Sequence, residues 1–169
     1  MRAAAGGGEV LFILVVAAWL LYGVVRNHLD DEVGATLALL AAGLALAANQ
    51  LISMAWTRPR PFTSHPGAVH VLLAHPADGS FPSDHAAAGF AIALCLYLVH
   101  RRFGIAALVL AAVMSYARVY VGNHYPGDVV GGMLVGVITA ALVVRLMSRP
   151  ARALWGLRRL GPGAPALHG

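Results

Sequence analysis

Hydrophobic residues form five long runs along the chain, separated by polar segments. The runs cover residues 10–25, 33–54, 86–99, 105–121 and 129–146, and the first three contain no charged residue. A helix needs about 20 mostly apolar residues to cross a bilayer. The pattern therefore predicts an all-α fold, a polytopic membrane bundle of about five transmembrane helices. The run 86–99 is short for a span unless its polar ends are included.

The composition agrees with a membrane location. Of the 169 residues, 59% are hydrophobic and 11% are charged, whereas soluble domains carry about 25% charged residues. The 12 basic residues are all arginine and lie scattered between the apolar runs. Because a nucleic-acid-binding protein would show a basic patch on a soluble face, we expect no nucleic-acid partner. The length fits a single domain over residues 1–169.

The arginines also predict which side of the membrane each loop faces. Cytoplasmic loops are enriched in Lys and Arg, and both the loop at 101–102 and the tail 149–169 are basic. We therefore expect these segments, and with them the C-terminus, on the cytoplasmic side. The long polar segment 56–84 and the turn 122–128 then lie together on the external side.

Two arginines run against this charge bias on the external side. Arg58 and Arg60 alternate with prolines in the segment Thr57–Phe62. Each proline fixes its own φ angle and disfavours a helical conformation at the preceding residue. We therefore predict an extended, stiff segment that holds both arginines. Taken alone, the same residues are also typical of arginine side chains that reach toward the membrane interface.

A second polar cluster, Phe81–His85, directly precedes the third apolar run. Ser83 and Asp84 are both good N-cap residues, and the free N–H groups of a helix N-terminus favour anions. His85 then lies in the first helical turn. In isolation the cluster could equally be an ordinary capped helix start.

A third cluster follows the fourth apolar run. Arg118 lies near the end of that run, and ionisable residues in such positions are functional candidates. His124 falls in the turn, and Pro126 suits the first position of the next helix. Asp128, four residues after His124, can reach back to accept a hydrogen bond from its imidazole. The simpler interpretation is an acidic residue that interacts favourably with the helix dipole.

In combination, the three clusters are far more specific than any one of them. Arg-x-Arg-Pro, Pro-Ser-x-His and Arg-x5-His-x3-Asp follow one another in this order. This order resembles the type-2 phosphatidic acid phosphatase (PAP2) superfamily over about residues 33–148, and most closely its BcrC-type undecaprenyl-diphosphate phosphatases. Three positions depart from the wider family: Ser53 stands in place of Lys, Ala117 stands in place of Ser, and Asp84 stands in place of Gly, as it does in the BcrC type.

The resemblance implies a role for each residue of the site. His124 is the expected nucleophile that forms a phosphohistidine, Asp128 orients its ring, and His85 protonates the leaving oxygen. The residues expected to surround the phosphate are Arg58, Arg60, Ser83, Asp84 and Arg118. The family chemistry implies no metal ion and no cofactor, because phosphoryl transfer depends mainly on positioning and on charge stabilisation, which arginines can supply.

The implied function is hydrolysis of undecaprenyl diphosphate, or a similar polyprenyl diphosphate, to the monophosphate on the external side of the bacterial inner membrane. Such an enzyme recycles the lipid carrier for cell-envelope synthesis and opposes bacitracin. Two alternatives stay open: a phosphatidylglycerophosphate, phosphatidate or lipid A phosphatase of the same family, and a non-catalytic lipid-binding or transport protein. If the protein is a phosphatase, its expected partner is a phosphorylated lipid substrate. The sequence is compatible with an oligomer.

Three further histidines lie in the long external segment. His65, His70 and His75 are five residues apart and have no cysteine partner nearby, which does not match the usual spacing of zinc ligands. We expect them to line or cover the site rather than to bind a metal.

Overall fold

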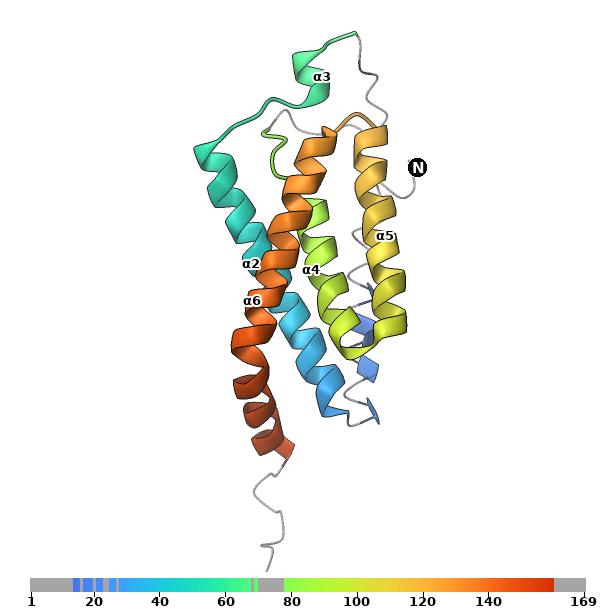
Figure 1. Cartoon of the computed structure of the whole chain (residues 1–169), viewed down its shortest axis with the longest axis vertical. Helices are drawn as coiled ribbons and strands as arrows, with labels where there is room; N and C mark the ends of the chain where they lie inside the picture. Colours follow the sequence, from blue (N-terminus) through green and yellow to red (C-terminus); the bar gives the residue numbers. More distant parts are fainter. Residues whose placement is uncertain are drawn as a thin grey trace, which may run out of the picture.

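The fold is described here from a computed structural model of the chain, which places residues 28–67, 69 and 78–159 and scattered positions between 14 and 26. All of its regular elements over this part of the chain are helices, as the hydrophobic pattern predicts (Figure 1). The helices are α2 (Leu29–Ala55), α3 (Pro61–Ser64), α4 (Asp84–Val99), α5 (Arg101–Tyr120) and α6 (Pro126–Arg159). The first expected helix, over 10–25, lies largely outside the described residues.

Helices α2, α4, α5 and α6 correspond to the four later hydrophobic runs, with shifted ends. Helix α2 begins at Leu29, before the apolar run, because Asp30, Asp31 and Glu32 in its first turn interact favourably with the helix dipole. Helix α6 continues through Pro150 to Arg159. Half of the segment expected as a basic tail is therefore helical, since its Ala, Leu and Arg residues favour that conformation.

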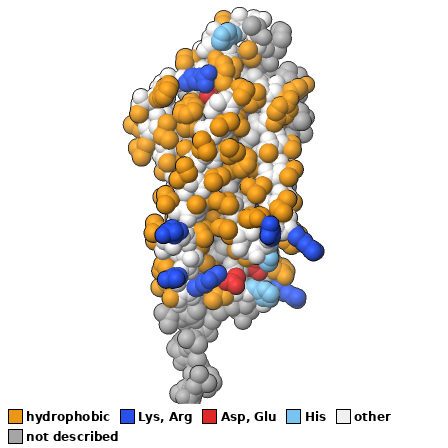
Figure 2. All heavy atoms as spheres, in the orientation of Figure 1, with side chains coloured by type: hydrophobic (Ala, Val, Ile, Leu, Met, Phe, Trp, Pro, Cys, Tyr) orange, Lys and Arg blue, Asp and Glu red, His pale blue; other side chains and the backbone are white. Residues whose placement is uncertain are grey.

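Three of these helices are long and apolar enough to span a bilayer: α2, α5 and α6 as far as Leu154. Helix α4 has 16 residues and is shorter, as its apolar run suggests. Large hydrophobic side chains on the outer surface are strongly exposed, among them Met54 at 73% and Phe103 at 69%. Figure 2 shows such side chains over the length of the visible face, with most of its basic side chains near the lower end. This surface is typical of a membrane protein.

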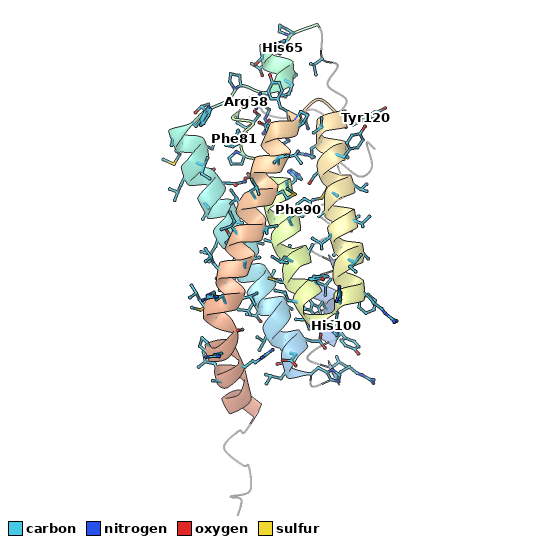
Figure 3. The ribbon with its side chains drawn as sticks, in the orientation of Figure 1. Arg58, His65, Phe81, Phe90, His100 and Tyr120 are labelled. Carbon is cyan, nitrogen blue, oxygen red and sulfur yellow. The ribbon has the colours of Figure 1, made fainter. Side chains whose placement is uncertain are left out.

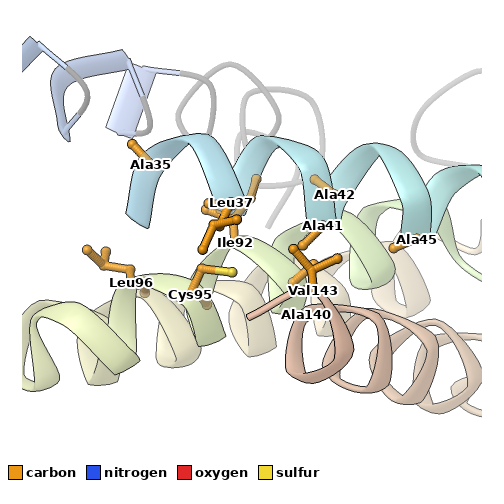
Figure 4. Packing of buried hydrophobic residues seen from close by; sticks show 14 of the residues in the cluster. Ala35, Leu37, Ala41, Ala42, Ala45, Ile92, Cys95, Leu96, Ala140 and Val143 are labelled. Atoms are coloured by element: carbon orange, nitrogen blue, oxygen red, sulfur yellow. The ribbon is translucent and has the colours of Figure 1, made fainter. Parts of the chain in front are cut away.

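Helix α4 lies at the centre of the bundle and packs against α2, α5 and α6 (Figure 1). The core consists mainly of alanines with a few larger residues (Figure 4). Gly132 and Gly136 of α6 face the backbone of α4, because an added Cβ would lie 2.2 Å from the carbonyl oxygens of Ser83 and Ala87, respectively. Small residues let helix backbones approach closely in membranes, and this approach brings the starts of α4 and α6 together.

A buried carboxylate ties together the opposite end of the bundle. Asp31 of α2 is 1% exposed and accepts a hydrogen bond from the indole Nε1 of Trp19 at 2.9 Å. Its carboxylate also bonds to the ring of His100, between α4 and α5 (Figure 3). These contacts join the N-terminal part of the chain to α2 and to the α4–α5 junction, far from the polar loops.

Candidate active site

The segment that carries Arg58 and Arg60 is extended as far as Arg60, as its prolines predict, whereas Pro61 and Phe62, also expected to be extended, begin α3. Arg60 has φ −66° and ψ 154°. Pro59 forms an antiparallel β-bridge with Gly79, and the Ser80 N–H donates to the Arg58 carbonyl at 2.8 Å. A short two-stranded ladder therefore joins the end of α2 to the segment that leads into α4.

The loop between α5 and α6 holds His124 in a buried position. The carbonyl of Arg118 accepts hydrogen bonds from the N–H groups of Asn123 and His124, at 3.1 and 3.3 Å. Gly122 has a φ of 80°, a conformation that glycine adopts without a steric cost. His124 is 4% exposed as a result, and Pro126 starts α6 at once.

The contacts of the His124 ring define where its proton lies. Nδ1 is 2.8 Å from the carbonyl oxygen of Ser80, and Nε2 is 3.3 Å from Nη1 of Arg60. A carbonyl only accepts hydrogen bonds and a guanidinium only donates them. Nδ1 therefore carries the proton, and Nε2 presents its lone pair. This tautomer leaves Nε2 able to act as a nucleophile.

Asp128, the residue expected to orient His124, lies beside the imidazole ring. The carboxylate lies 3.8 Å from Nδ1, too far for a hydrogen bond. Its oxygens instead accept the backbone N–H of Tyr125 at 2.8 Å and Nη1 of Arg58 at 3.1 Å. Asp128 is fully buried beside the ring, so it contributes negative charge there while the Ser80 carbonyl takes the proton.

Arg58 contacts Asp128 and Tyr125. Besides pairing with Asp128, its guanidinium stacks on the ring of Tyr125 at 3.9 Å. It borders a mostly apolar pocket with Trp56, Phe81 and Gly127. The structure thus does not bring Arg58 into the pocket that contains His124.

The pocket that contains His124 has a volume of about 180 Å³ and brings together four of the eight expected site residues: Arg60, Asp84, His85 and His124. It is lined by Asn49, Gln50, Ser53, Arg60, Asp78, Gly79, Pro82, Asp84, His85 and His124. His85 and His124 thus line the same pocket as the buried side chain of Arg60.

Two other expected phosphate ligands, Ser83 and Arg118, are buried near the pocket. Ser83 is the N-cap of α4, but its side chain makes no capping bond, and its buried Oγ has no hydrogen-bond partner. Its N–H donates to the Asp128 carbonyl at 2.9 Å, which ties α4 to α6. Arg118 is 5% exposed at the end of α5. A buried hydroxyl without a partner is costly, which is consistent with a bond to a ligand.

Polar residues at the end of α2 form another wall of the pocket. Asn49 is 1% exposed, and its Nδ2 donates to a carboxylate oxygen of Asp84 at 2.9 Å. Ser53, which stands where the family has Lys, lies on the same face. The carboxylate of Asp84 is thus directed toward α2 by an uncharged donor.

Of the three further histidines, the described one, His65, does not line this pocket. His65 is exposed after α3, and His70 and His75 lie outside the described residues. In the part of the chain that the structure describes, no group of three or more His, Cys, Asp or Glu side chains is arranged to hold a metal ion.

Sequence reasoning missed three contributors to the site: Ser80, Asp78 and Asn49 as a partner of Asp84. Ser80 acts through its backbone carbonyl, a group that every residue has, so its residue type gives no signal. The pairing of Asp78 with Arg60, through Nε at 2.8 Å, depends on the register of the ladder. Asn49 could be recognised only as part of a polar helix face.

Comparison with known proteins agrees with this geometry. The family model of the PAP2 superfamily matches residues 34–152. The chain belongs to the PAP2 superfamily. The match covers the pocket, the three polar clusters and the four helices that hold them.

Individual relatives in this superfamily are phosphatases of lipid substrates by name. The chain is 38% identical over 104 residues to undecaprenyl-diphosphatase BcrC of Bacillus subtilis, which covers 62% of this chain and 52% of that protein. It is 31% identical over 143 residues to an undecaprenyl-diphosphatase of Sulfolobus acidocaldarius, covering 84% and 66%. The chain thus spans about half the length of the BcrC relative.

A solved structure has a similar fold. It is a transmembrane PAP2-type phosphatidylglycerolphosphate phosphatase from Bacillus subtilis, with a TM-score of 0.60 and 26% identity. The similarity covers 88% of this chain and 73% of that one. The helical bundle described above is therefore a known PAP2 arrangement.

Proposed function

We propose that this protein is a membrane phosphatase that removes the terminal phosphate of undecaprenyl diphosphate or a similar polyprenyl diphosphate. The observation that carries the proposal is the His124 ring, whose Nε2 lone pair lies 3.3 Å from Nη1 of Arg60 in a pocket shared with His85. A neutral imidazole beside a fixed cation suits attack on an anionic phosphorus. The names of the BcrC and archaeal relatives support the choice of substrate.

The reaction proceeds in two displacements. Nε2 of His124 attacks the terminal phosphorus, and a phosphorus–nitrogen bond forms while the bond to the bridging oxygen breaks. His85 donates a proton to that leaving oxygen, and the lipid monophosphate departs. A water molecule, from which His85 now takes a proton, then attacks the phosphohistidine and releases inorganic phosphate together with free His124.

Charge stabilisation comes from the residues around the pocket. Arg60 and Arg118 neutralise the phosphoryl oxygens, and the Ser83 hydroxyl donates a further hydrogen bond. When the ring of His124 becomes positively charged in the intermediate, Nδ1–H keeps its bond to the Ser80 carbonyl, and the buried carboxylate of Asp128 lies 3.8 Å away. These groups need no metal ion or cofactor for the reaction.

The position of the pocket supports a lipid substrate. It lies at the end of the bundle where the apolar surfaces of α2 and α6 give way to polar loops, so a prenyl chain can stay in the bilayer while its diphosphate enters. We place this end on the external side of the bacterial inner membrane and the end of α6 on the cytoplasmic side, following the arginine-rich loop and C-terminal segment. The product would return to envelope-polymer synthesis.

A second candidate is a glycerolipid phosphatase. The similarity to a phosphatidylglycerolphosphate phosphatase over 88% of the chain favours it specifically. The same residues would perform the same displacements, and only the lipid that carries the phosphate would differ.

The test is phosphate release by the protein purified in detergent, with EDTA present. The substrates are undecaprenyl diphosphate, phosphatidylglycerophosphate and phosphatidate. His124→Gln is the inactive variant, and His65→Gln, an exposed histidine outside the pocket, is the matched control. We expect preference for the prenyl diphosphate, loss of activity in His124→Gln and full activity in His65→Gln. Preference for a glycerolipid would favour the second candidate, and an active His124→Gln variant would refute the mechanism.

A further inference from the structure

We propose that Asp78 is a positioning residue for this phosphatase, one that orients the guanidinium of Arg60 toward the nucleophile. The inference rests on the proposed function and adds to it a residue outside the three polar clusters. It starts from one contact: Nε of Arg60 donates to a carboxylate oxygen of Asp78 at 2.8 Å.

The backbone places the two residues opposite each other. Pro59 pairs with Gly79 in the antiparallel bridge, and the N–H of Ser80 bonds to the carbonyl of Arg58. In this register Arg60 and Asp78 face each other, at the separation where cross-strand side chains interact. The same short ladder carries the Ser80 carbonyl that holds His124. One segment therefore orients the arginine and the histidine together.

The contacts of the guanidinium show what this orientation achieves. Nε is used by Asp78, and Nη1 donates to the carbonyl of Asn123 at 3.0 Å and faces Nε2 of His124 at 3.3 Å. The bonds from Arg60 to described residues thus leave Nη2 for a phosphoryl oxygen. Arginine presents its N–H groups in a fixed planar fork. Holding the Nε edge therefore directs the opposite edge at the phosphorus that His124 attacks.

Burial explains why a carboxylate is needed there. The Arg60 side chain is 5% exposed, whereas that of Asp78 is 59% exposed. A buried cation requires a counter-charge, and an exposed carboxylate supplies one at little desolvation cost to itself. Asp78 bonds to the edge away from the reacting atoms, so it can keep this bond while phosphate is present.

The experiment compares Asp78→Asn and Asp78→Glu with the wild-type protein. We expect kcat of Asp78→Asn to fall about 10- to 100-fold while KM changes less than about twofold, because a misoriented group lowers the rate of the chemical step. Asp78→Glu keeps the charge and is expected to restore part of kcat. The matched control is Asp30→Asn, whose side chain is 69% exposed and pairs with Arg152 at 3.1 Å at the other end of the bundle. We expect kcat and KM of this control variant to equal those of the wild-type protein.

A double-mutant cycle tests whether Asp78 acts through its arginine. In an Arg60→Lys background, Asp78→Asn is expected to change kcat less than about twofold, because coupled residues are not additive. A general folding defect would instead add to the effect of Arg60→Lys.

An unchanged kcat in Asp78→Asn would overturn the inference while the proposed function stands. If KM also fell in this variant, Asp78 would be competing with phosphate for Arg60. A wild-type protein that releases phosphate from no lipid would instead overturn the proposed function, and this inference with it.

Discussion

Replacing Gly132 by alanine tests whether the close approach of α4 and α6 builds the site. The added Cβ would lie 2.2 Å from the carbonyl oxygen of Ser83, whereas non-bonded heavy atoms prefer about 3.5–4.0 Å. The contact is with backbone, which cannot rotate away, so the helices must separate by about 1 Å. Overpacking of this kind costs about 1–3 kcal/mol.

The same displacement should affect catalysis. Ser83 donates its N–H to the carbonyl of Asp128, four residues before Gly132 on α6. A shift of about 1 Å between reacting groups can lower a rate about 100-fold. We therefore expect Gly132→Ala to lower kcat by about 10- to 100-fold.

Alanine variants of two other glycines serve as controls that distinguish an effect on stability from an effect on catalysis. Gly136→Ala creates the same 2.2 Å contact, with the Ala87 carbonyl one turn deeper in the bundle, whereas a Cβ on Gly43 of α2 meets nothing within 4 Å. In detergent, we expect the melting temperature to fall by a similar amount in Gly132→Ala and Gly136→Ala and to stay level or rise in Gly43→Ala. Phosphate release should fall most in Gly132→Ala. If Gly132→Ala matches Gly43→Ala in both melting temperature and activity, the close contact between α4 and α6 is not needed for stability or for catalysis.

Two further predictions concern buried polar groups at opposite ends of the bundle. Ser83→Ala should raise KM for the lipid phosphate about 5- to 30-fold with an unchanged melting temperature, because the Ser83 Oγ bonds to no protein group that would be lost. An unchanged KM would contradict a role in binding. Asp31→Ala should lower stability by about 1–3 kcal/mol, because it leaves Trp19 and His100 without their acceptor. Thermal unfolding measures this loss, and an unaltered melting temperature would argue against it.

The sequence by itself determined the helices and the residue types of the site. Long apolar runs can only be spans or buried helices, since backbone polar groups in lipid must be paired within the helix. The prolines beside Arg58 and Arg60 likewise imposed an extended backbone, because their effect is local. The continuation of α6 to Arg159 was not predicted. Charged residues end the apolar pattern near residue 146, but they do not disfavour a helix.

Tertiary structure decided which partner each polar side chain takes. His124 and Asp128 are four residues apart, a spacing that suggests a hydrogen bond, yet the imidazole bonds to the Ser80 carbonyl from a segment 44 residues away. Arg58 and Arg60 are alike in sequence, but Arg58 pairs with Asp128 and Arg60 faces Nε2 of His124. Such choices depend on strand register and helix approach, which arise from packing between distant parts of the chain and not from local sequence.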